Sequence, residues 1–378
     1  MINLIVTLSK YLLLILIALY TLESFIVFGY RYEEDKRYIL KKQLMLIFFM
    51  DFMAFLVIFL KKQELEIIYF FIVQLLYFIA VQILYRIFYK NSSLLLLNHT
   101  CMLLSIGFIM LARLDMESAV RQFEIVVIAT IIAMVIPVMI HKFRFLNKWT
   151  WFYAVVGLLL LLTVLVLGKN VNGAKINISF GGFAFQPSEF AKVTVILFLA
   201  FIISKIQERY VEDINKPTRL LIIFVAVAIP LLLIIKQPDY GTAMAFCIAL
   251  AMMLFTAGLD KKYIIGAVLI ACISVPILYN FILPEHAKKR IDIFLNPESD
   301  PRGSGYNIIQ SKLAIGAGQL TGMGLLKGNQ TQLGYLYPKT TDFIFSVIGE
   351  EMGFIVGRYN YSTICISGHK SDLYSKDG

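Results

Sequence analysis

The sequence is poor in charge for its length. Of its 378 residues, 16% are Asp, Glu, Lys or Arg and 59% are hydrophobic, and the mean hydropathy is +0.77. A soluble protein of this length needs a larger share of polar residues to cover its surface. The composition therefore excludes a soluble globular enzyme and favours a membrane protein.

Residues that usually mark a soluble active site are also scarce. The chain has four histidines and four cysteines, and neither type shows the spacing of a metal site or of a disulfide framework. It contains no glycine-rich phosphate loop and no nucleophile elbow. The residues alone leave three classes open, which are a transporter, a channel and a membrane-embedded transferase.

Long apolar blocks are what the sequence does contain. Each is about 17–25 residues long, which is the length of helix that crosses a hydrocarbon layer of about 30 Å. Backbone polar groups inside that layer must be paired within the segment, so each block is expected to be helical. We predict an all-α, polytopic membrane protein with about eleven spans. These spans are 11–30, 44–60, 66–85, 94–112, 123–140, 150–168, 188–204, 219–235, 240–258, 263–283 and 342–357.

The net charge of +10 is distributed along the whole chain. Basic residues lie in the short loops between spans, which indicates membrane topology and argues against a nucleic-acid partner. One set of loops carries about twice as many lysines and arginines as the other, which places the first set in the cytoplasm and the N-terminus outside. The loops 169–187, 236–239 and 284–341 are then external. The last is expected to contain short helices at the surface or re-entering the bundle.

Ionisable residues at membrane depth are candidates for function, because burying them there is costly. Glu350 and Glu351 lie inside the last predicted span, and their pattern fits either buried structural hydrogen bonds or a functional role. Glu189 and Lys192 are three residues apart on one helix, which favours a structural ion pair. Pro187 before them suits a first helical turn.

Three further residues lie in the loops predicted to be external. Asp239 is placed to cap the helix that follows it. Asp300 lies between a serine and a proline, which by itself indicates a turn. Arg290 has the chemistry to hold a phosphate, although a basic run at a membrane boundary also meets lipid headgroups.

Four segments together resemble the FtsW/RodA/SpoVE family of cell-wall glycan polymerases. They are NGAKINISFGGFAFQPSEFAK, KQPDYGTA, NPESDPRGSGYNIIQSKLAIGAGQLTGMGL and TDFIFSVIGEEMGF. The resemblance implies a peptidoglycan glycosyltransferase in the bacterial cytoplasmic membrane that polymerises lipid II at the outer face. It also implies a class B penicillin-binding protein as partner and a role in elongation, division or sporulation.

The resemblance places Asp300 at the family's essential outer-loop aspartate, where it would act as general base. The leaving diphosphate would be neutralised by Arg290, by Lys192 or by a divalent cation, and no other cofactor is implied. Further residues fall on recurrent positions of the family and are expected to bind substrate or support the pocket. These residues are Gln186, Ser188, Glu189, Gln237, Asp239, Tyr306, Gln310, Ser311, Thr341, Asp342 and Glu350.

The resemblance also divides the chain. Residues 1–92 are expected to be three additional N-terminal helices, 93–357 the family's membrane domain without its last two helices, and 358–378 a disordered or frameshifted tail. A chain of this kind is expected to have little or no activity. A lipid II flippase and a non-catalytic scaffold for a penicillin-binding protein remain as alternatives.

Overall fold

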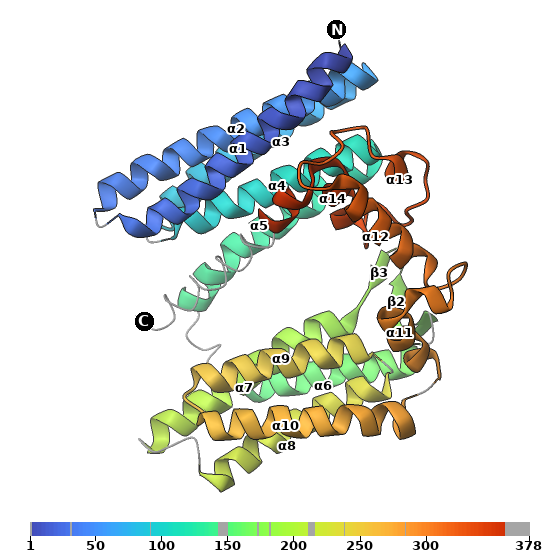
Figure 1. The fold of residues 1–378 in the computed structure, drawn as a ribbon. Helices are drawn as coiled ribbons and strands as arrows, with labels where there is room; N and C mark the ends of the chain where they lie inside the picture. Colours follow the sequence, from blue (N-terminus) through green and yellow to red (C-terminus); the bar gives the residue numbers. More distant parts are fainter. Residues whose placement is uncertain are drawn as a thin grey trace. The chain divides into compact units, whose positions relative to one another are not determined.

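The computed structural model describes residues 2–30, 32–90, 92–142, 150–171, 174–180, 183–210, 216–237, 239–283 and 285–359. The chain divides into two compact units. The first contains Met1–Ile132 and Arg290–Gly378, and the second contains Ala133–Lys289. Figure 1 shows the helices of both units, and each unit is described separately here.

Long helices begin the first unit. They are α1 (Ile2–Gly29), α2 (Glu33–Lys62), α3 (Leu65–Phe88), α4 (Leu94–Leu114) and the start of α5 (Met116–Lys142). At 1.5 Å per residue, each of the first four is long enough to cross a bilayer. Helix α2 packs against α1, α3 and α4, so it lies at the centre of this bundle.

The interior of this bundle combines aromatic packing with paired polar groups. Phe70, Phe78 and Phe108 are buried, and the ring of Phe70 meets the ring of Phe108 edge to face. Asp51 is also fully buried, and its carboxylate accepts hydrogen bonds from Gln74 and from the Ser105 hydroxyl. These bonds join α2 to α3 and α4, and they satisfy polar groups that hydrocarbon would leave unpaired.

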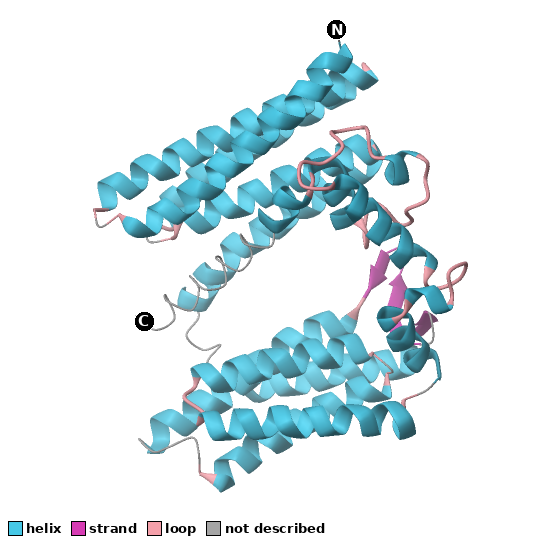
Figure 2. Ribbon diagram, in the orientation of Figure 1, coloured by secondary structure: helices cyan, strands magenta, loops and turns pink. Residues whose placement is uncertain are grey.

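The first unit continues with short helices, as predicted for 284–341. They are α11 (Glu285–Leu295), which begins just before the unit boundary, the 3₁₀ turn η3 (Pro297–Ser299), α12 (Tyr306–Gly318), α13 (Asn329–Gln332) and α14 (Ile344–Met352). Figure 2 shows the irregular loops that join α12, α13 and α14. Helix α12 packs against both α13 and α14.

The last predicted span, 342–357, was expected to be one uninterrupted helix, and this prediction is wrong. Helix α14 ends at Met352, Gly353 adopts a left-handed φ of 88°, and helical backbone resumes from 354 to 359. The interruption lets the N–H groups of Phe354 and Ile355 donate to the carbonyls of Gln319 and Leu320, at 2.9 and 3.3 Å. Contacts with a distant loop therefore break the helix.

The first two residues of the predicted tail 358–378 lie within the range that the structure describes. Arg358 and Tyr359 are helical, and the buried Tyr359 ring packs edge to face on Tyr20 of α1. The rest of the predicted tail, 360–378, lies outside the described residues.

The second unit is also mainly helical. It contains α6 (Thr150–Leu167), α7 (Pro187–Tyr210), α8 (Pro217–Lys236), α9 (Tyr240–Thr256), α10 (Lys261–Ile277) and the π-helical turn η2 (Leu278–Ile282). Helix α7 packs against α6, α8 and α9. Three short antiparallel strands, which the sequence did not predict, occupy the loop between α6 and α7. They are β1 (Lys169–Val171), β2 (Ala174–Phe180) and β3 (Phe183–Phe185), in the order β1-β2-β3.

Helix lengths and compositions identify an integral membrane protein. Among the described residues, seven helices are long and apolar enough to cross a membrane, and two shorter apolar helices lie at Trp151–Leu167 and Tyr240–Thr256. The predicted class, an all-helical polytopic membrane protein, is confirmed apart from the three short strands. The count of about eleven spans stays a prediction.

Candidate functional site

The backbone between η3 and α12 forms a tight turn around Asp300. The Asp300 carbonyl accepts the N–H groups of Gly303 and Gly305, at 3.3 and 3.0 Å. The Oδ2 atom of its carboxylate accepts the N–H of Ser304 at 3.2 Å. These bonds fix both the backbone and the side chain of Asp300, which is half-buried at this position.

Both glycines of this turn are required by close contacts. A Cβ atom on Gly303 would lie 2.5 Å from Oδ1 of Asp300, and one on Gly305 would lie 2.1 Å from the carbonyl oxygen of Pro297. Real Cβ atoms do not approach other heavy atoms so closely, so a side chain at Gly305 would displace the backbone of the turn, whereas one at Gly303 would push the Asp300 carboxylate out of its position. The spacing Asp-Pro-x-Gly-x-Gly is therefore what lets the carboxylate fold back over its own loop.

Helix α12 follows this turn and packs closely on α14. The hydroxyls of Ser311 and Ser346 are 2.7 Å apart across the two helices. Near the end of α12, a Cβ atom on Gly318 would lie 1.8 Å from the carbonyl oxygen of Gly349. Small residues thus let the two backbones approach each other, as they do between membrane helices.

Apart from Arg290 on α11, the other predicted residues of the first unit lie on or beside these two helices. Tyr306 and Gln310 are half-buried on α12, whereas Thr341 and Asp342 are exposed just before α14. Glu350 is fully buried near the end of α14. The structure thus gathers most of the predicted residues of this unit onto two packed helices and their adjoining turns.

Glu350 caps the short helix α13. Its Oε1 atom accepts the N–H of Gln330 at 2.7 Å, and its Oε2 atom accepts the N–H of Thr331 at 3.1 Å together with the Thr331 hydroxyl. The carboxylate therefore pairs the N–H groups that the start of a helix leaves without partners. Of the two interpretations left open for Glu350, this geometry fits buried structural hydrogen bonds.

Glu351 forms a buried ion pair with Arg113, the penultimate residue of α4. The two side chains are 0% and 3% exposed. The Oε1 atom of Glu351 also accepts the N–H of Gly328 at 3.2 Å. Arg113 lies one residue beyond the predicted span 94–112, and the sequence did not single it out as a functional candidate. A lone arginine at the end of an otherwise apolar span was the available signal.

Asp115 follows Arg113 in the short link between α4 and α5. Its carboxylate accepts the hydroxyl of Ser118 and, at 2.9 Å, the N–H of the same residue. These hydrogen bonds, the hydroxyl first, lower the pKa of Asp115. Asp115 thereby caps the start of α5.

In the second unit, four predicted residues lie at the start of α7. The helix begins at Pro187, as predicted, and Lys192 Nζ lies 2.7 Å from Glu189 Oε1 in the predicted ion pair. Gln186 is half-buried just before the helix, and Ser188 is 1% exposed with no hydrogen-bond partner for its hydroxyl among the described residues.

Two more predicted residues stand at the start of α9. Asp239 caps this helix as predicted, because its Oδ1 atom accepts the N–H of Thr242 at 3.1 Å. Gln237 is buried, and its side-chain amide donates to the carbonyl of Leu161 at 2.8 Å. Gln237 therefore ties the end of α8 to α6.

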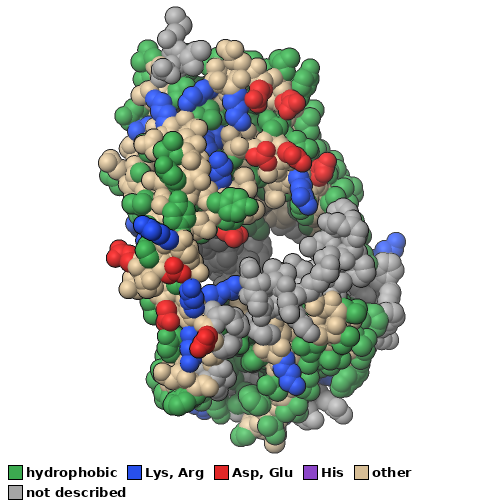
Figure 3. Space-filling model, turned by 90° about the vertical axis from the view of Figure 1, so that its right-hand side faces the viewer, with side chains coloured by type: hydrophobic (Ala, Val, Ile, Leu, Met, Phe, Trp, Pro, Cys, Tyr) green, Lys and Arg blue, Asp and Glu red, His purple; other side chains and the backbone are tan. Residues whose placement is uncertain are grey.

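Arg290 is exposed on α11. Figure 3 shows one face of the molecule, on which acidic and basic side chains lie close together. Within the described ranges, no group of three or more His, Cys, Asp and Glu side chains has the arrangement of a metal site. The cationic groups available for a phosphate among the predicted residues are Arg290 and Lys192.

Comparison with known proteins connects the chain to one family. The sequence model of the FtsW/RodA/SpoVE family, described as cell cycle proteins, matches residues 93–359. The peptidoglycan glycosyltransferase MrdB of Escherichia coli K12 is 35% identical over 242 residues, which are 64% of this chain and 62% of MrdB. The probable peptidoglycan glycosyltransferase FtsW of Trichlorobacter lovleyi is 42% identical over 211 residues, covering 55% of this chain and 54% of that protein.

A solved structure gives the same fold. A chain from the structure described as "Structural coordination of polymerization and crosslinking by a peptidoglycan synthase complex" matches with a TM-score of 0.58 at 24% identity, covering 73% of this chain and 76% of that one. The chain spans between half and two thirds of the length of the curated relatives named above. With the matched range covering most of the sequence, the chain belongs to the FtsW/RodA/SpoVE family.

Proposed function

We propose that this protein is a peptidoglycan glycosyltransferase that polymerises lipid II at the outer face of the bacterial cytoplasmic membrane. The names of the relatives MrdB and FtsW, both described as peptidoglycan glycosyltransferases, support the reaction class. The observation that carries the proposal is the turn around Asp300, which holds a carboxylate in a fixed orientation at the start of α12. Fixed geometry of this kind is what a general base requires.

The proposed reaction is a displacement at the anomeric carbon of the donor. Asp300 accepts the proton of the acceptor sugar hydroxyl while that oxygen forms a bond to the anomeric carbon. The bond from the anomeric carbon to the phosphate oxygen breaks, and undecaprenyl diphosphate leaves with the electron pair. The charge that develops on the diphosphate requires a cation, for which Arg290, Lys192 or a divalent ion are the candidates.

Of the remaining predicted residues, Ser311 joins α12, which begins directly after the Asp300 turn, to α14 through its hydroxyl. In the second unit, Gln237 ties the end of α8 to α6, and Asp239 caps the start of α9. An external position for the Asp300 turn and for the N-terminus is part of the same proposal.

The proposed partner is a class B penicillin-binding protein that crosslinks the glycan product. The matched structure is described as a complex that coordinates polymerisation with crosslinking, which supports this choice. At 24% identity, the similarity to this structure concerns the fold alone. The choice of partner therefore rests on the description of that complex and on the family.

The test is polymerisation of purified lipid II by the 378-residue chain in detergent. Replacing Asp300 with Asn should lower the rate about 10²–10⁴-fold, because proton transfer by a positioned base contributes that much. Glu298→Gln is the matched control, since Glu298 is an exposed carboxylate in the same loop. Equal rates for the wild type and Asp300→Asn would refute the assignment of the base.

The two alternatives give different results in the same experiments. A lipid II flippase would move lipid II across proteoliposomes without forming polymer, and it should depend on Glu350 and Glu351. Both carboxylates are engaged in fixed hydrogen bonds, which favours a structural role for them. A non-catalytic scaffold would bind its penicillin-binding protein equally well in the wild type and in Asp300→Asn.

A further inference from the structure

Helices α1, α2 and α3 precede the range that matches the family, and the first unit shows what two of them contact. The loop between α12 and α13 lies against α1 and α2. Leu325 and Leu326 of this loop are buried in the same hydrophobic cluster as Leu13 of α1 and Ile58 of α2. The N-terminal helices therefore share a core with a loop that belongs to the matched region.

Leu326 of this loop has an unusual backbone conformation. Its φ is 63°, a left-handed conformation that is uncommon for a residue with a branched side chain. Its carbonyl accepts two hydrogen bonds, from Lys61 Nζ at 2.8 Å and from the side-chain amide of Gln332 at 3.0 Å. Lys61, the penultimate residue of α2, thus holds the carbonyl of a strained residue.

Two neighbouring lysines make contacts at the same end of the bundle. Lys327 Nζ donates to the hydroxyl of Thr7 on α1 at 2.8 Å. Lys62 Nζ donates to the carbonyl of Ala112 at 3.2 Å, next to the arginine that pairs with Glu351. Helices α1 and α2 are therefore joined to this loop and to the end of α4.

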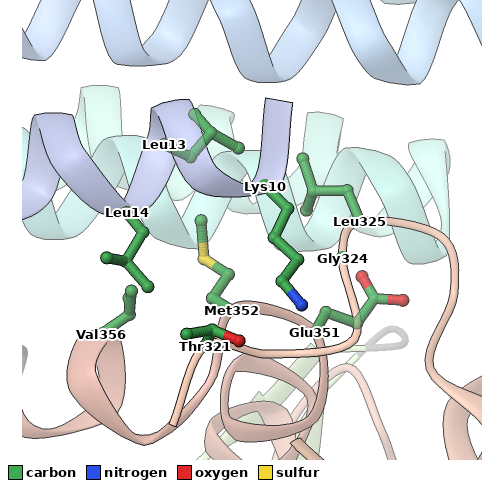
Figure 4. A pocket seen from close by; sticks show the side chains of 9 residues that line it. All are labelled: Lys10, Leu13, Leu14, Thr321, Gly324, Leu325, Glu351, Met352 and Val356. Atoms are coloured by element: carbon green, nitrogen blue, oxygen red, sulfur yellow. The ribbon is translucent and has the colours of Figure 1, made fainter. Parts of the chain in front are cut away.

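A small recess lies between α1 and the loop. Figure 4 shows the side chains of Lys10 and Glu351 among those that line it. Oε2 of Glu351 is buried and has no hydrogen-bond partner among the described residues. Arg113 is the ion-pair partner of Glu351, and the Lys10 side chain of α1 lines the same recess.

Continuous contacts lead from this loop to Asp300. The N–H groups of Gly328 and Thr331 bind the carboxylates of Glu351 and Glu350 on α14. Helix α14 packs closely on α12, and α12 begins at the turn that orients Asp300. A displacement of the loop would therefore shift α14 and, through α12, the candidate base.

We propose that the N-terminal helices position the catalytic turn, and that Lys61 is the residue through which α2 does so. This inference rests on the proposed function. Lys61 is a positioning residue that acts through Leu326, the loop and the two packed helices. It should affect the orientation of Asp300 and leave the affinity for lipid II unchanged.

The experiment compares Lys61→Met, Lys61→Arg and Lys41→Met in the full chain. Lys41 is an exposed lysine on α2 and serves as the matched control. Hydrogen exchange of peptides covering 324–332 measures the loop, and lipid II polymerisation measures kcat and KM. Lys61→Met should exchange about tenfold faster in these peptides, because the loop loses a bond that holds it closed.

The same variant should lower kcat about 3- to 30-fold with KM within about twofold, the usual range for coupling through packed elements. Lys61→Arg keeps a donor and should restore most of kcat. Faster exchange with an unchanged kcat would overturn the positioning role, and unchanged exchange would overturn the contact itself. If the wild type forms no polymer, the proposed function fails, and the exchange data still decide whether Lys61 holds the loop.

Discussion

Removing one partner of the buried pair between Arg113 and Glu351 should destabilise the protein far more than removing both charges. The two side chains are 3% and 0% exposed, so neither can turn to water when its partner is lost. Breaking a buried ion pair in this way costs about 3–5 kcal/mol. For Arg113→Met we therefore expect the midpoint of thermal unfolding to fall by on the order of 10 °C.

The pairwise contribution can be measured with a double-mutant cycle of Arg113→Met and Glu351→Gln. The double variant contains neither charge, so it should lose less stability than either single variant, and the coupling should then be about 3 kcal/mol or more. The assay is thermal unfolding in one detergent, followed by intrinsic fluorescence. All variants are heated at the same scan rate, because membrane proteins often unfold irreversibly and the midpoint then depends on that rate.

The pair of Glu189 and Lys192 provides the control for this cycle. Its side chains are 52% and 22% exposed, and a pair of this kind contributes about 1 kcal/mol or less. Glu189→Gln and Lys192→Met should therefore show little coupling. If the losses at Arg113 and Glu351 add, or do not exceed those of the control pair, the argument from burial is refuted.

Two predictions concern other residues of the first unit. Gly303→Ala should lower the polymerisation rate at least about tenfold, because its Cβ would displace the Asp300 carboxylate, whereas Gly316→Ala, on α12 with nothing within 4 Å, should keep the wild-type rate. Equal rates for the two would refute it. Ser118 lowers the pKa of Asp115, so the stability that Asp115 contributes is present above its unfolded pKa of about 3.9 and is lost as the pH falls through the folded value. Unfolding midpoints of the wild type and Asp115→Asn should differ at pH 7 and converge as the pH falls through the lowered folded pKa of Asp115, and a constant difference would contradict this.

Features that depend on local sequence could be predicted well. The long helices follow from the lengths of apolar blocks, because the thickness of the hydrocarbon layer sets the length of a span. The pair of Glu189 with Lys192 and the capping by Asp239 depend on residues three positions apart, which the helical repeat brings together. The resemblance identified the matched region, and the proline after Asp300 indicated the turn at that residue.

Features that depend on distant contacts could not be predicted. Arg113 and Glu351 are separated by 238 positions in the sequence, so no local pattern relates them. The break at Gly353 arises because the loop after α12 uses the backbone N–H groups that would otherwise continue the helix. The strands between α6 and α7 were missed for a different reason, because Ala174–Phe180 does alternate between apolar and polar residues, as a strand does, and this local signal was not used.

The close approach of α12 and α14 has a consequence for how this part of the protein tolerates change. Two helices whose backbones approach this closely depend on the fit of their facing surfaces. Gly318 against the Gly349 carbonyl leaves no space for even a methyl group. A methyl group added at Gly318 would force these two helices apart, whereas exposed leucines elsewhere on the bundle can be replaced by other apolar residues.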